Sequence, residues 1–431
     1  RITNCFVRDV TFKDQGAYIG GLVGKNKGAL ERDAFYGTYS ISGTGTSIGG
    51  IAGLSDAGSI SNCYVNANMD VNTTTGATVG GIAGVLDGHL QGCTTKGRII
   101  CNSQGAVVGG IAGSADTSAL LTNSNSAMNI TGGRYTGGVV GKYKSNNSLT
   151  ACSSTGNVTG NGIAGGLIGQ LSSNQALIEK SYATGDIYSS GTQAGTGDAD
   201  GTIFAAGGLI GSVVMPPYSK IGINHCYTMG NVSANTNVHA IGGFIGYIYS
   251  NNPGSGKNGI LVSTSYASGK VSSGNAFLGK AMTSLNSAIL DINGFYFDSS
   301  KNTPSFSING VTGLSTSELT KQSTMERNGF YSSAWVYQSG KPPQLTSSGS
   351  GTPTTTPGYK VTTNTDTSNL IFYVKTSGGG GGGGGSVVVT ILTNSTSDQQ
   401  SYKSLTQMTT ETLFKMLGFS DSATGYITVV S

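Results

Sequence analysis

One five-residue motif, two glycines followed by two apolar residues and a third glycine, recurs along most of this chain. Its first glycine stands at residues 20, 49, 80, 109, 137, 165, 207 and 242, so the successive steps are 29, 31, 29, 28, 28, 42 and 35 residues. A worn ninth copy occupies residues 275–279. Self-similarity at a period of this size is typical of a solenoid, in which each repeat packs only against its neighbours.

Each repeat contains two or three short apolar or alternating segments separated by Gly, Ser, Asn and Thr, which is typical of short β-strands. A coil of this length predicts a parallel β-helix whose coils stack about 4.8 Å apart. A sheet stack or β-sandwich array is the alternative. We expect the motif glycines to supply left-handed turns and close backbone approach. Of the two apolar residues, one should face the core and the other a neighbouring face.

A second repeat position carries only small residues. They are Cys5, Cys63, Cys93, Cys152 and Cys226, with Ala34, Ser124, Ser181 and Ser265 in the other repeats. The pattern predicts an inward corner that admits small side chains, because a free cysteine behaves as a small hydrophobe. A disulfide between Cys63 and Cys93 of adjacent coils is the alternative.

The fold class is therefore all-β, a parallel β-helix of about nine coils followed by a cap and a small α+β module. Short helices are expected at 285–292 and 315–324, and in the last part strands at 387–392 and 426–430 with a helix at 409–417. The four parts are a solenoid at 1–280, its cap at 281–345, a Ser/Thr/Pro/Gly linker at 346–358, and the module at 359–431, which a run of glycines interrupts.

The coils after residue 185 carry insertions, which in solenoids become loops on one face, often the binding face. Tyr218, Tyr247 and Tyr249 lie in or beside these insertions and are candidates for an aromatic binding patch. Asp198 and Asp200 resemble the start of a calcium loop, although the later acidic ligand of such loops is missing. We expect no cofactor, and Ca²⁺ at these two residues is the alternative.

Asp56, Asp87 and Asp116 each stand three residues after a motif, so stacking would align them in an acidic ladder. Two carboxylates about 5 Å apart can support retaining glycoside hydrolysis. However, Lys27 and Lys144 occupy the flanking coils, and no partner acid is evident. A solvated turn is the favoured interpretation, and a bound cation comes second. No nucleophile motif stands out, so we expect no enzyme activity.

The composition of the chain limits the classes of partner that it can bind. Charged residues make up 10% of the chain, against about a quarter in ordinary globular domains. The net charge is +4 without any Lys/Arg run, which argues against nucleic acid as a partner. No apolar run approaches the ~20 residues of a membrane helix, so no membrane span is expected in this segment. Because the chain opens within a repeat, we expect it to be part of a longer protein.

The segments Gly20-Gly-Leu-Val-Gly24 and Ser181-Tyr-Ala-Thr-Gly-Asp-Ile187 resemble the GLUG repeats of bacterial surface proteins. The resemblance covers about residues 1–280. It implies a non-enzymatic, extracellular protein of the bacterial cell surface, a rigid stalk for adhesion or display. Its partners would be glycans or proteins of the host or of neighbouring cells. The alternative is a structural subunit of a self-assembling extracellular filament or sheath, bound to copies of itself. A polysaccharide-acting β-helix enzyme is a distant third.

Overall fold

The computed structural model divides the chain into two units, Arg1–Gly351 and Thr352–Ser431. In the first unit it describes residues 1–13, 16–43, 47–73, 76–192, 203–250, 259–281, 290–303 and 307–346. In the second it describes the strands β40 (Leu370–Thr376), β41 (Ser386–Thr393) and β42 (Thr424–Val430).

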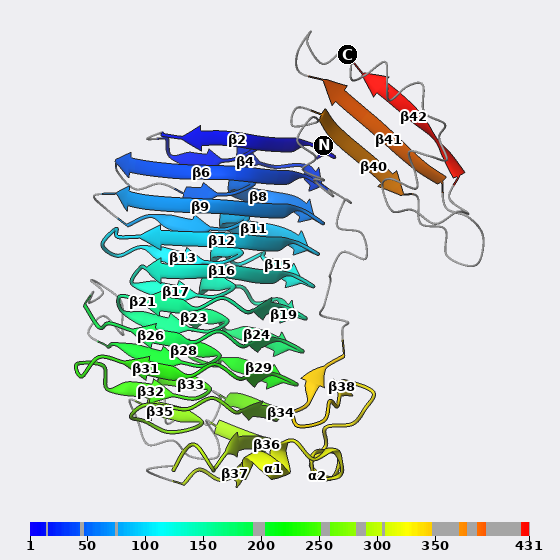
Figure 1. Ribbon diagram of the computed structural model, residues 1–431. Helices are drawn as coiled ribbons and strands as arrows, with labels where there is room; N and C mark the ends of the chain where they lie inside the picture. The colour runs from blue at the N-terminus through cyan, green and yellow to red at the C-terminus, as the bar shows by residue number, and fades with distance from the viewer. Residues whose placement is uncertain are drawn as a thin grey trace. The chain divides into compact units, whose positions relative to one another are not determined.

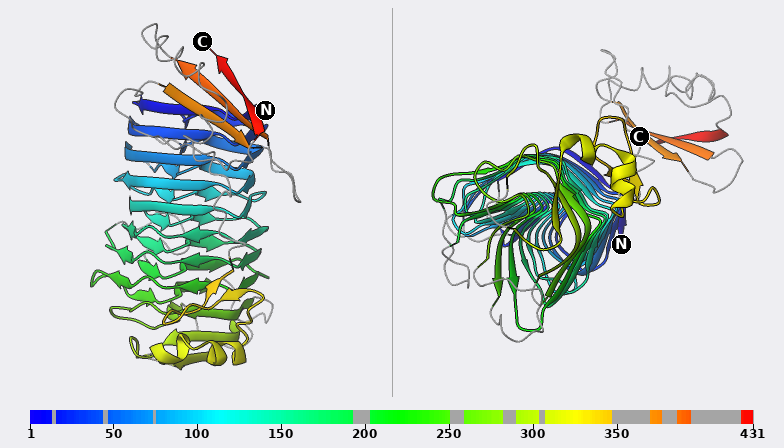
Figure 2. Two further views of the ribbon diagram at one scale, coloured as in Figure 1. Left: turned by 45° about the vertical axis from the view of Figure 1, so that its right-hand side comes forward. Right: turned by 90° about the horizontal axis from the view of Figure 1, so that it is seen from below.

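The first unit is a parallel β-solenoid of about nine turns, as the repeats predict (Figure 1). Each coil contributes a short strand before the Gly-Gly motif, a strand after it, a strand that leads to a corner, and a strand that leaves the corner. Corresponding strands of successive coils pair in parallel and in register, for example Gly49, Gly80 and Gly109. Like residues therefore form columns along the solenoid, and Figure 2 shows the coils superposed when viewed from below.

The strands before the motif form a separate eight-stranded sheet of β3 (Tyr18–Gly20), β7 (Ser47–Gly49), β10 (Thr78–Gly80), β13 (Val107–Gly109), β17 (Tyr135–Gly137), β22 (Ile163–Gly165), β27 (Ala205–Gly207) and β32 (Ala240–Gly242). The strands after the motif are β4 (Val23–Asn26), β8 (Ala52–Ser61), β11 (Ala83–Gln91), β14 (Ala112–Ala115), β18 (Val140–Tyr143), β23 (Ile168–Ser172), β28 (Ile210–Met215), β33 (Ile245–Ser250) and β35 (Leu278–Ala281).

Strands that lead to the corner are β1 (Ile2–Thr3), β5 (Ala29–Glu31), β15 (Leu120–Thr122), β19 (Ser148–Thr150), β24 (Gln175–Glu179), β29 (Lys220–Asn224), β34 (Gly259–Ala267) and β36 (Leu290–Asp298). Strands that leave it are β2 (Phe6–Phe12), β6 (Ala34–Gly43), β9 (Tyr64–Thr73), β12 (Thr94–Cys101), β16 (Asn125–Gly132), β20 (Ser153–Ser154), β21 (Val158–Gly160), β25 (Tyr182–Ala183), β26 (Ile187–Ser189), β30 (Tyr227–Thr228), β31 (Val232–Ala234) and β37 (Val311–Leu314). β8, β11, β34 and β36 each serve two of these roles.

The motif positions require glycine because the structure leaves no space for a Cβ atom there. A Cβ on Gly80 would lie 1.9 Å from the Ala83 carbonyl oxygen, and one on Gly81 would lie 2.1 Å from that of Gly110. A Cβ on Gly84 would lie 2.5 Å from the amide nitrogen of Ile48 in the preceding coil. None of the three has a positive φ. The expected close backbone approach is confirmed, whereas the expected left-handed turns at these glycines are wrong.

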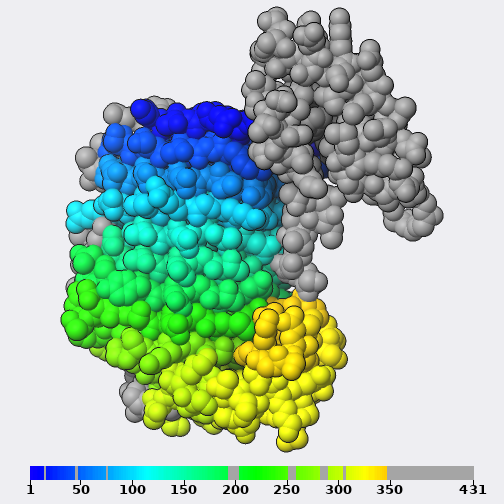
Figure 3. Space-filling model, in the orientation of Figure 1, coloured from blue at the N-terminus to red at the C-terminus, as the bar shows by residue number. Residues whose placement is uncertain are grey.

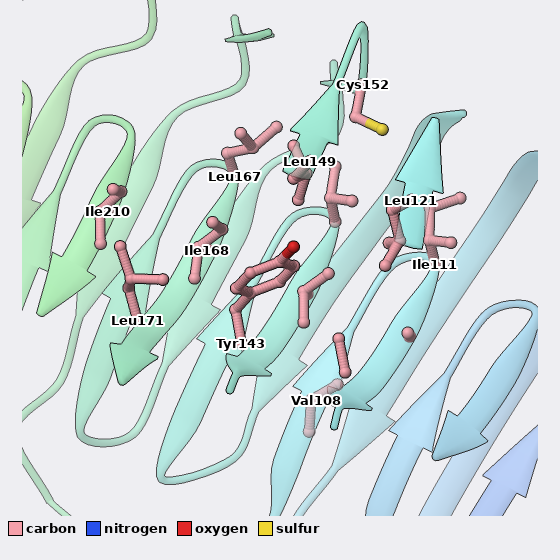
Figure 4. Close-up of a cluster of buried hydrophobic side chains, with 14 of the residues drawn as sticks. Val108, Ile111, Leu121, Tyr143, Leu149, Cys152, Leu167, Ile168, Leu171 and Ile210 are labelled. Atoms are coloured by element: carbon pink, nitrogen blue, oxygen red, sulfur yellow. The ribbon is translucent and has the colours of Figure 1, made fainter. Parts of the chain in front are cut away.

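Both apolar residues of each motif face the interior. Ile82 and Ala83, like Leu167 and Ile168, are fully buried, so the expectation that one of the pair faces elsewhere is wrong. They join one continuous apolar cluster that runs through the stacked coils. Figure 4 shows part of it, with Ile111, Leu149 and Leu167 from different coils directed inward. The core grows along one axis, as expected of a solenoid.

The left-handed conformation lies instead at the corner, one residue before the small-residue column. It is adopted by Asn4, Arg32, Asn62, Gly92, Asn123, Ala151, Lys180, His225, Thr264 and Gly294, the last of which precedes Phe295 instead of a small residue. The small residue that follows supports the turn in two ways. The Ser124 hydroxyl donates to the Thr122 carbonyl oxygen at 2.9 Å and accepts from the Cys93 amide of the preceding coil at 3.1 Å. Ser181 and Cys152 repeat this arrangement.

The register of the coils corrects one residue that the sequence analysis assigned to the small-residue column. Asp33, and not Ala34, aligns with Cys5 and Cys63, because Ala34 pairs with Phe6 and Tyr64. The buried carboxylate of Asp33 accepts hydrogen bonds from the amides of Cys5 and Glu31, and burial raises its pKa. All six cysteines are free thiols, so the alternative of a Cys63–Cys93 disulfide is excluded, and Cys63, Cys93, Cys152 and Cys226 are buried at the corner as predicted.

The parallel pairing continues beyond residue 280, because β36 pairs with β34 in register and β37 pairs with β36. Residues 290–292 belong to β36, so the helix expected at 285–292 is wrong for its described part. Two short helices, α1 (Thr316–Leu319) and α2 (Gln322–Arg327), occupy the second predicted helical region. A small antiparallel pair follows, β38 (Trp335–Val336) with β39 (Gln344–Leu345). We call residues 315–345 the cap segment.

The second unit contains a three-stranded sheet in which β41 pairs antiparallel with β40 and parallel with β42. β41 and β42 coincide with the two strands that the sequence predicts. The helix expected at 409–417 lies outside the described residues. Among the residues that the structure describes, no helix has the length and apolar character needed to cross a bilayer.

Candidate binding surface

The residues that follow the corner residues align in register and form one column along the side of the solenoid, in which Ala34, Ser153, Tyr227 and Tyr266 are buried. In register they are Phe6, Ala34, Tyr64, Thr94, Asn125, Ser153, Tyr182, Tyr227, Tyr266 and Tyr296. We call this row the lateral column. It has aromatic residues at both ends and small polar residues in three consecutive coils between them.

The tyrosines at the C-terminal end of the lateral column are stacked. The ring centroids of Tyr182 and Tyr227 lie 4.7 Å apart with planes 5° from parallel, and those of Tyr227 and Tyr266 lie 5.2 Å apart, also at 5°. These distances match the spacing of paired strands, so the ring planes lie across the solenoid axis. Burial raises the pKa of Tyr227 and Tyr266 well above the usual value for tyrosine.

The cap segment covers part of this stack. The Trp335 ring lies 6.0 Å from the rings of both Tyr227 and Tyr266, and Phe330 packs beside it. The Tyr266 hydroxyl donates to the Pro343 carbonyl oxygen at 2.6 Å. Figure 3 shows the cap segment, in yellow, projecting from the side of the last coils. An aromatic surface on this face can therefore hold a polypeptide segment within the same chain.

A second aromatic group lies at the N-terminal end of the same face. Phe6 and Tyr36 have ring centroids 5.2 Å apart, and Tyr36 and Tyr64 have centroids 5.4 Å apart, with tilted planes. Partial burial raises the pKa of Tyr36 to about 12 and also raises that of Tyr64. All three side chains are partly exposed.

Thr94, Asn125 and Ser153 separate the two aromatic groups, and we call them the polar interval. The Ser153 hydroxyl donates to the Asn125 side-chain oxygen at 2.7 Å. The buried Thr94 hydroxyl oxygen has no hydrogen-bond partner among the described residues. Sequence reasoning missed the lateral column, although four of its five tyrosines, Tyr64, Tyr182, Tyr227 and Tyr266, directly follow a Cys or Ser of the small-residue column.

The three tyrosines predicted from the insertions have different surroundings. Tyr247 is 3% exposed and packs in a cluster with Tyr135, Ile163, Ala205 and Ala240. Tyr249 is partly buried beside that cluster, whereas Tyr218 is 60% exposed in the turn after β28. An aromatic contact patch at these residues remains a prediction, with Tyr218 as its exposed member. Asp198 and Asp200 lie outside the described residues.

The predicted acidic ladder exists, and lysines flank it. Asp56 pairs in register with Asp87. Lys25 and Lys27 contact the Asp56 carboxylate at 2.9 and 3.4 Å and lower its pKa, and Lys144 contacts Asp116 at 3.1 Å. In the described ranges, no group of three or more His, Cys, Asp or Glu side chains is placed to hold a metal ion. Ion pairs with lysines therefore occupy the two ends of the ladder, at Asp56 and Asp116.

The fold and its columns define the class of the protein, a parallel β-solenoid built from repeated motifs. Residues 44–72 match the GLUG motif, and they span β7, β8 and most of β9, which is one coil. The chain matches no curated protein with significant similarity. The protein is a GLUG-motif β-solenoid.

Proposed function

We propose that this GLUG-motif β-solenoid is a non-enzymatic, extracellular protein of the bacterial cell surface, where it acts as a rigid stalk for adhesion or display. The observation that supports this role best is the unbroken, in-register pairing of coils from β2 to β37. Each coil is bonded to its neighbours by strand ladders, corner hydrogen bonds and a shared core. Such an array resists bending and aligns its outward side chains in columns along its length.

The surface chemistry also favours contact with neutral partners. Only 10% of the residues are charged, and Ser, Thr and Asn are abundant in the chain. These side chains donate and accept hydrogen bonds without the salt sensitivity of charged contacts. Glycans or proteins of the host or of neighbouring cells are the partners that this surface fits.

Two measurements test the role. Protease treatment of intact producing cells should release fragments of the solenoid if the protein lies on the cell surface. Beads coated with the full chain should remain on host or neighbouring cells under shear flow, whereas beads coated with albumin should detach. Equal detachment of the two bead types, or complete protection from protease, would refute the proposal.

A filament subunit is the second candidate, because the outer strand β3 of the eight-stranded sheet pairs on one side only, with β7, within the described residues. Such edges accept strands from other chains. Negative-stain images of the purified full chain separate the two roles. Fibres whose length grows with protein concentration favour the filament, and separate short rods at every concentration contradict it.

A further inference from the structure

We propose that the cap segment is a pH-sensitive strap, which protonation of His225 loosens from the side of the solenoid. Loosening uncovers Tyr227 and Tyr266, so the exposed aromatic surface at this end of the lateral column becomes larger in acid. The device depends neither on the adhesion role nor on the filament role proposed above.

The cap segment can open without breaking the strand ladders of the solenoid. Its strands β38 and β39 pair only with each other among the described residues. Side-chain packing holds it to the last coils, since Phe330 and Trp335 lie against the Tyr266 ring. The Tyr266 hydroxyl also donates to the Pro343 carbonyl oxygen. A segment held in this way opens locally at a lower free-energy cost than coils that are bonded by ladders.

Two polar atoms in this contact have no hydrogen-bond partner among the described residues, the indole nitrogen of Trp335 and Nδ1 of His225. The two rings lie 6.3 Å apart, and Trp335 is 1% exposed. An indole N–H can only donate, and a protonated imidazole also has donors alone. Protonation of His225 therefore places a charge beside a buried indole that cannot accept its hydrogen bond, which is costly.

The surroundings of His225 disfavour its charged form. Burial is the largest influence on the pKa of His225 and lowers it. On the preceding coil, Glu179 raises that pKa and Lys180 lowers it, whereas the paired strand of the following coil presents the uncharged Ser263. Attraction of an imidazolium to the face of Trp335 would oppose the shift, but such attraction acts within about 6 Å, and the rings are farther apart.

Proton binding is thereby linked to opening of the cap segment. When the cap segment opens, His225 regains water and its pKa returns toward about 6.5. The open form then binds the proton more tightly than the closed form, so acid favours opening. The contact is complete above about pH 6.5 and is lost as the pH falls through the lower pKa of the closed form.

Trp335 is the only tryptophan of the chain, so tryptophan fluorescence reports on the cap segment directly. The test measures acrylamide quenching and the emission maximum of the full chain from about pH 7.5 to about pH 5, a range that spans the usual pKa of histidine. We expect the quenching constant to rise about twofold or more as the pH falls, with a red shift of the emission. The far-UV circular dichroism of the strands should not change.

Four variants isolate the cause. His225→Asn keeps a residue that this corner position already holds at Asn62 and Asn123, and its quenching constant should not depend on pH. If His225→Asn does not fold, His225→Gln is judged by the same criterion. His239→Asn replaces an exposed histidine and is the matched control, which should respond as the wild type does. Tyr266→Phe removes the hydrogen bond to the cap segment and should raise the quenching constant already at neutral pH.

Three results would overturn the inference. The first is a quenching constant of the folded wild type that is independent of pH. The second is an equal pH response in the wild type and in the folded His225 variant. The third is loss of the strand signal at the same pH as the change at Trp335, because the whole solenoid and not the cap segment alone would then be unfolding.

Discussion

Replacing a motif glycine by alanine tests whether backbone contact between coils explains the Gly-Gly signature. In Gly110→Ala the new Cβ would lie 2.1 Å from the Gly138 carbonyl oxygen of the next coil and 2.1 Å from the Ser126 hydroxyl. Gly110 has no positive φ, so backbone strain does not contribute. The Gly138 oxygen cannot retreat easily, because hydrogen bonds such as that from the Ile111 amide to the Val139 oxygen, at 2.9 Å, hold the two coils together.

The expected loss of stability depends on which atom the new Cβ would contact. Overpacking costs about 1–3 kcal/mol when side chains can adjust, and here the obstacle is backbone, so we expect at least ~3 kcal/mol. For a unit of about 350 residues, an unfolding entropy of roughly 2.1 cal/mol/K per residue gives ~0.7 kcal/mol/K. The thermal midpoint should therefore fall by about 4 °C or more. Far-UV circular dichroism during heating and urea titration measures both quantities.

Two further variants isolate the cause. Gly28→Ala is the matched control, since its Cβ would meet only the backbone nitrogen of Arg1 at 3.9 Å, and its stability should change by less than about 1 kcal/mol. Adding Ser126→Gly to Gly110→Ala removes the side-chain clash but leaves the backbone clash, so it should not restore stability. Equal midpoints for Gly110→Ala and Gly28→Ala would refute the reasoning, and rescue by Ser126→Gly would assign the effect to the side chain.

Three other predictions concern the corner and the surface. Ser124→Ala removes the acceptor of the Cys93 amide and should cost about 1–3 kcal/mol in urea titration, whereas Ser124→Thr, which keeps a hydroxyl, should cost less. Burial lowers the pKa of His225, so the unfolded state binds the imidazole proton more tightly than the folded state does. Stability should therefore decline as the pH falls below ~6.5. Asn tolerates the left-handed corner conformation, so His225→Asn should abolish this part of the pH dependence of the unfolding midpoint. Asp116→Asn breaks a half-exposed ion pair with Lys144 and should cost less than about 1 kcal/mol, with no cost in high salt.

The period of the motif was sufficient to predict the solenoid because its glycines are spatial requirements, which leave a sequence signature at every coil. The left-handed corner position has no such sequence signature. Asn, Arg, Ala, Lys, His and Thr all occupy it, as at Arg32, Lys180 and Thr264, since the hydrogen bonds of the next residue hold the turn. This variety also explains why the sequence analysis assigned Ala34 to the small-residue column in place of Asp33. The Asp33 carboxylate accepts the hydrogen bond from the amide of the preceding coil, as the serine hydroxyl does in other coils.

The lateral column could not be predicted for a different reason. A residue that faces outward in a solenoid is under no packing constraint from the core, so its identity varies from coil to coil, as Tyr64, Thr94 and Asn125 do. Only the register of the coils shows that such residues are neighbours in space, and register follows from the inward columns. In this fold the repeated packing of the interior thus fixes the spacing between surface residues of successive coils, whereas the identities of those surface residues vary independently. A break in the aromatic column, such as the one between Tyr64 and Tyr182, therefore leaves the register of the coils unchanged.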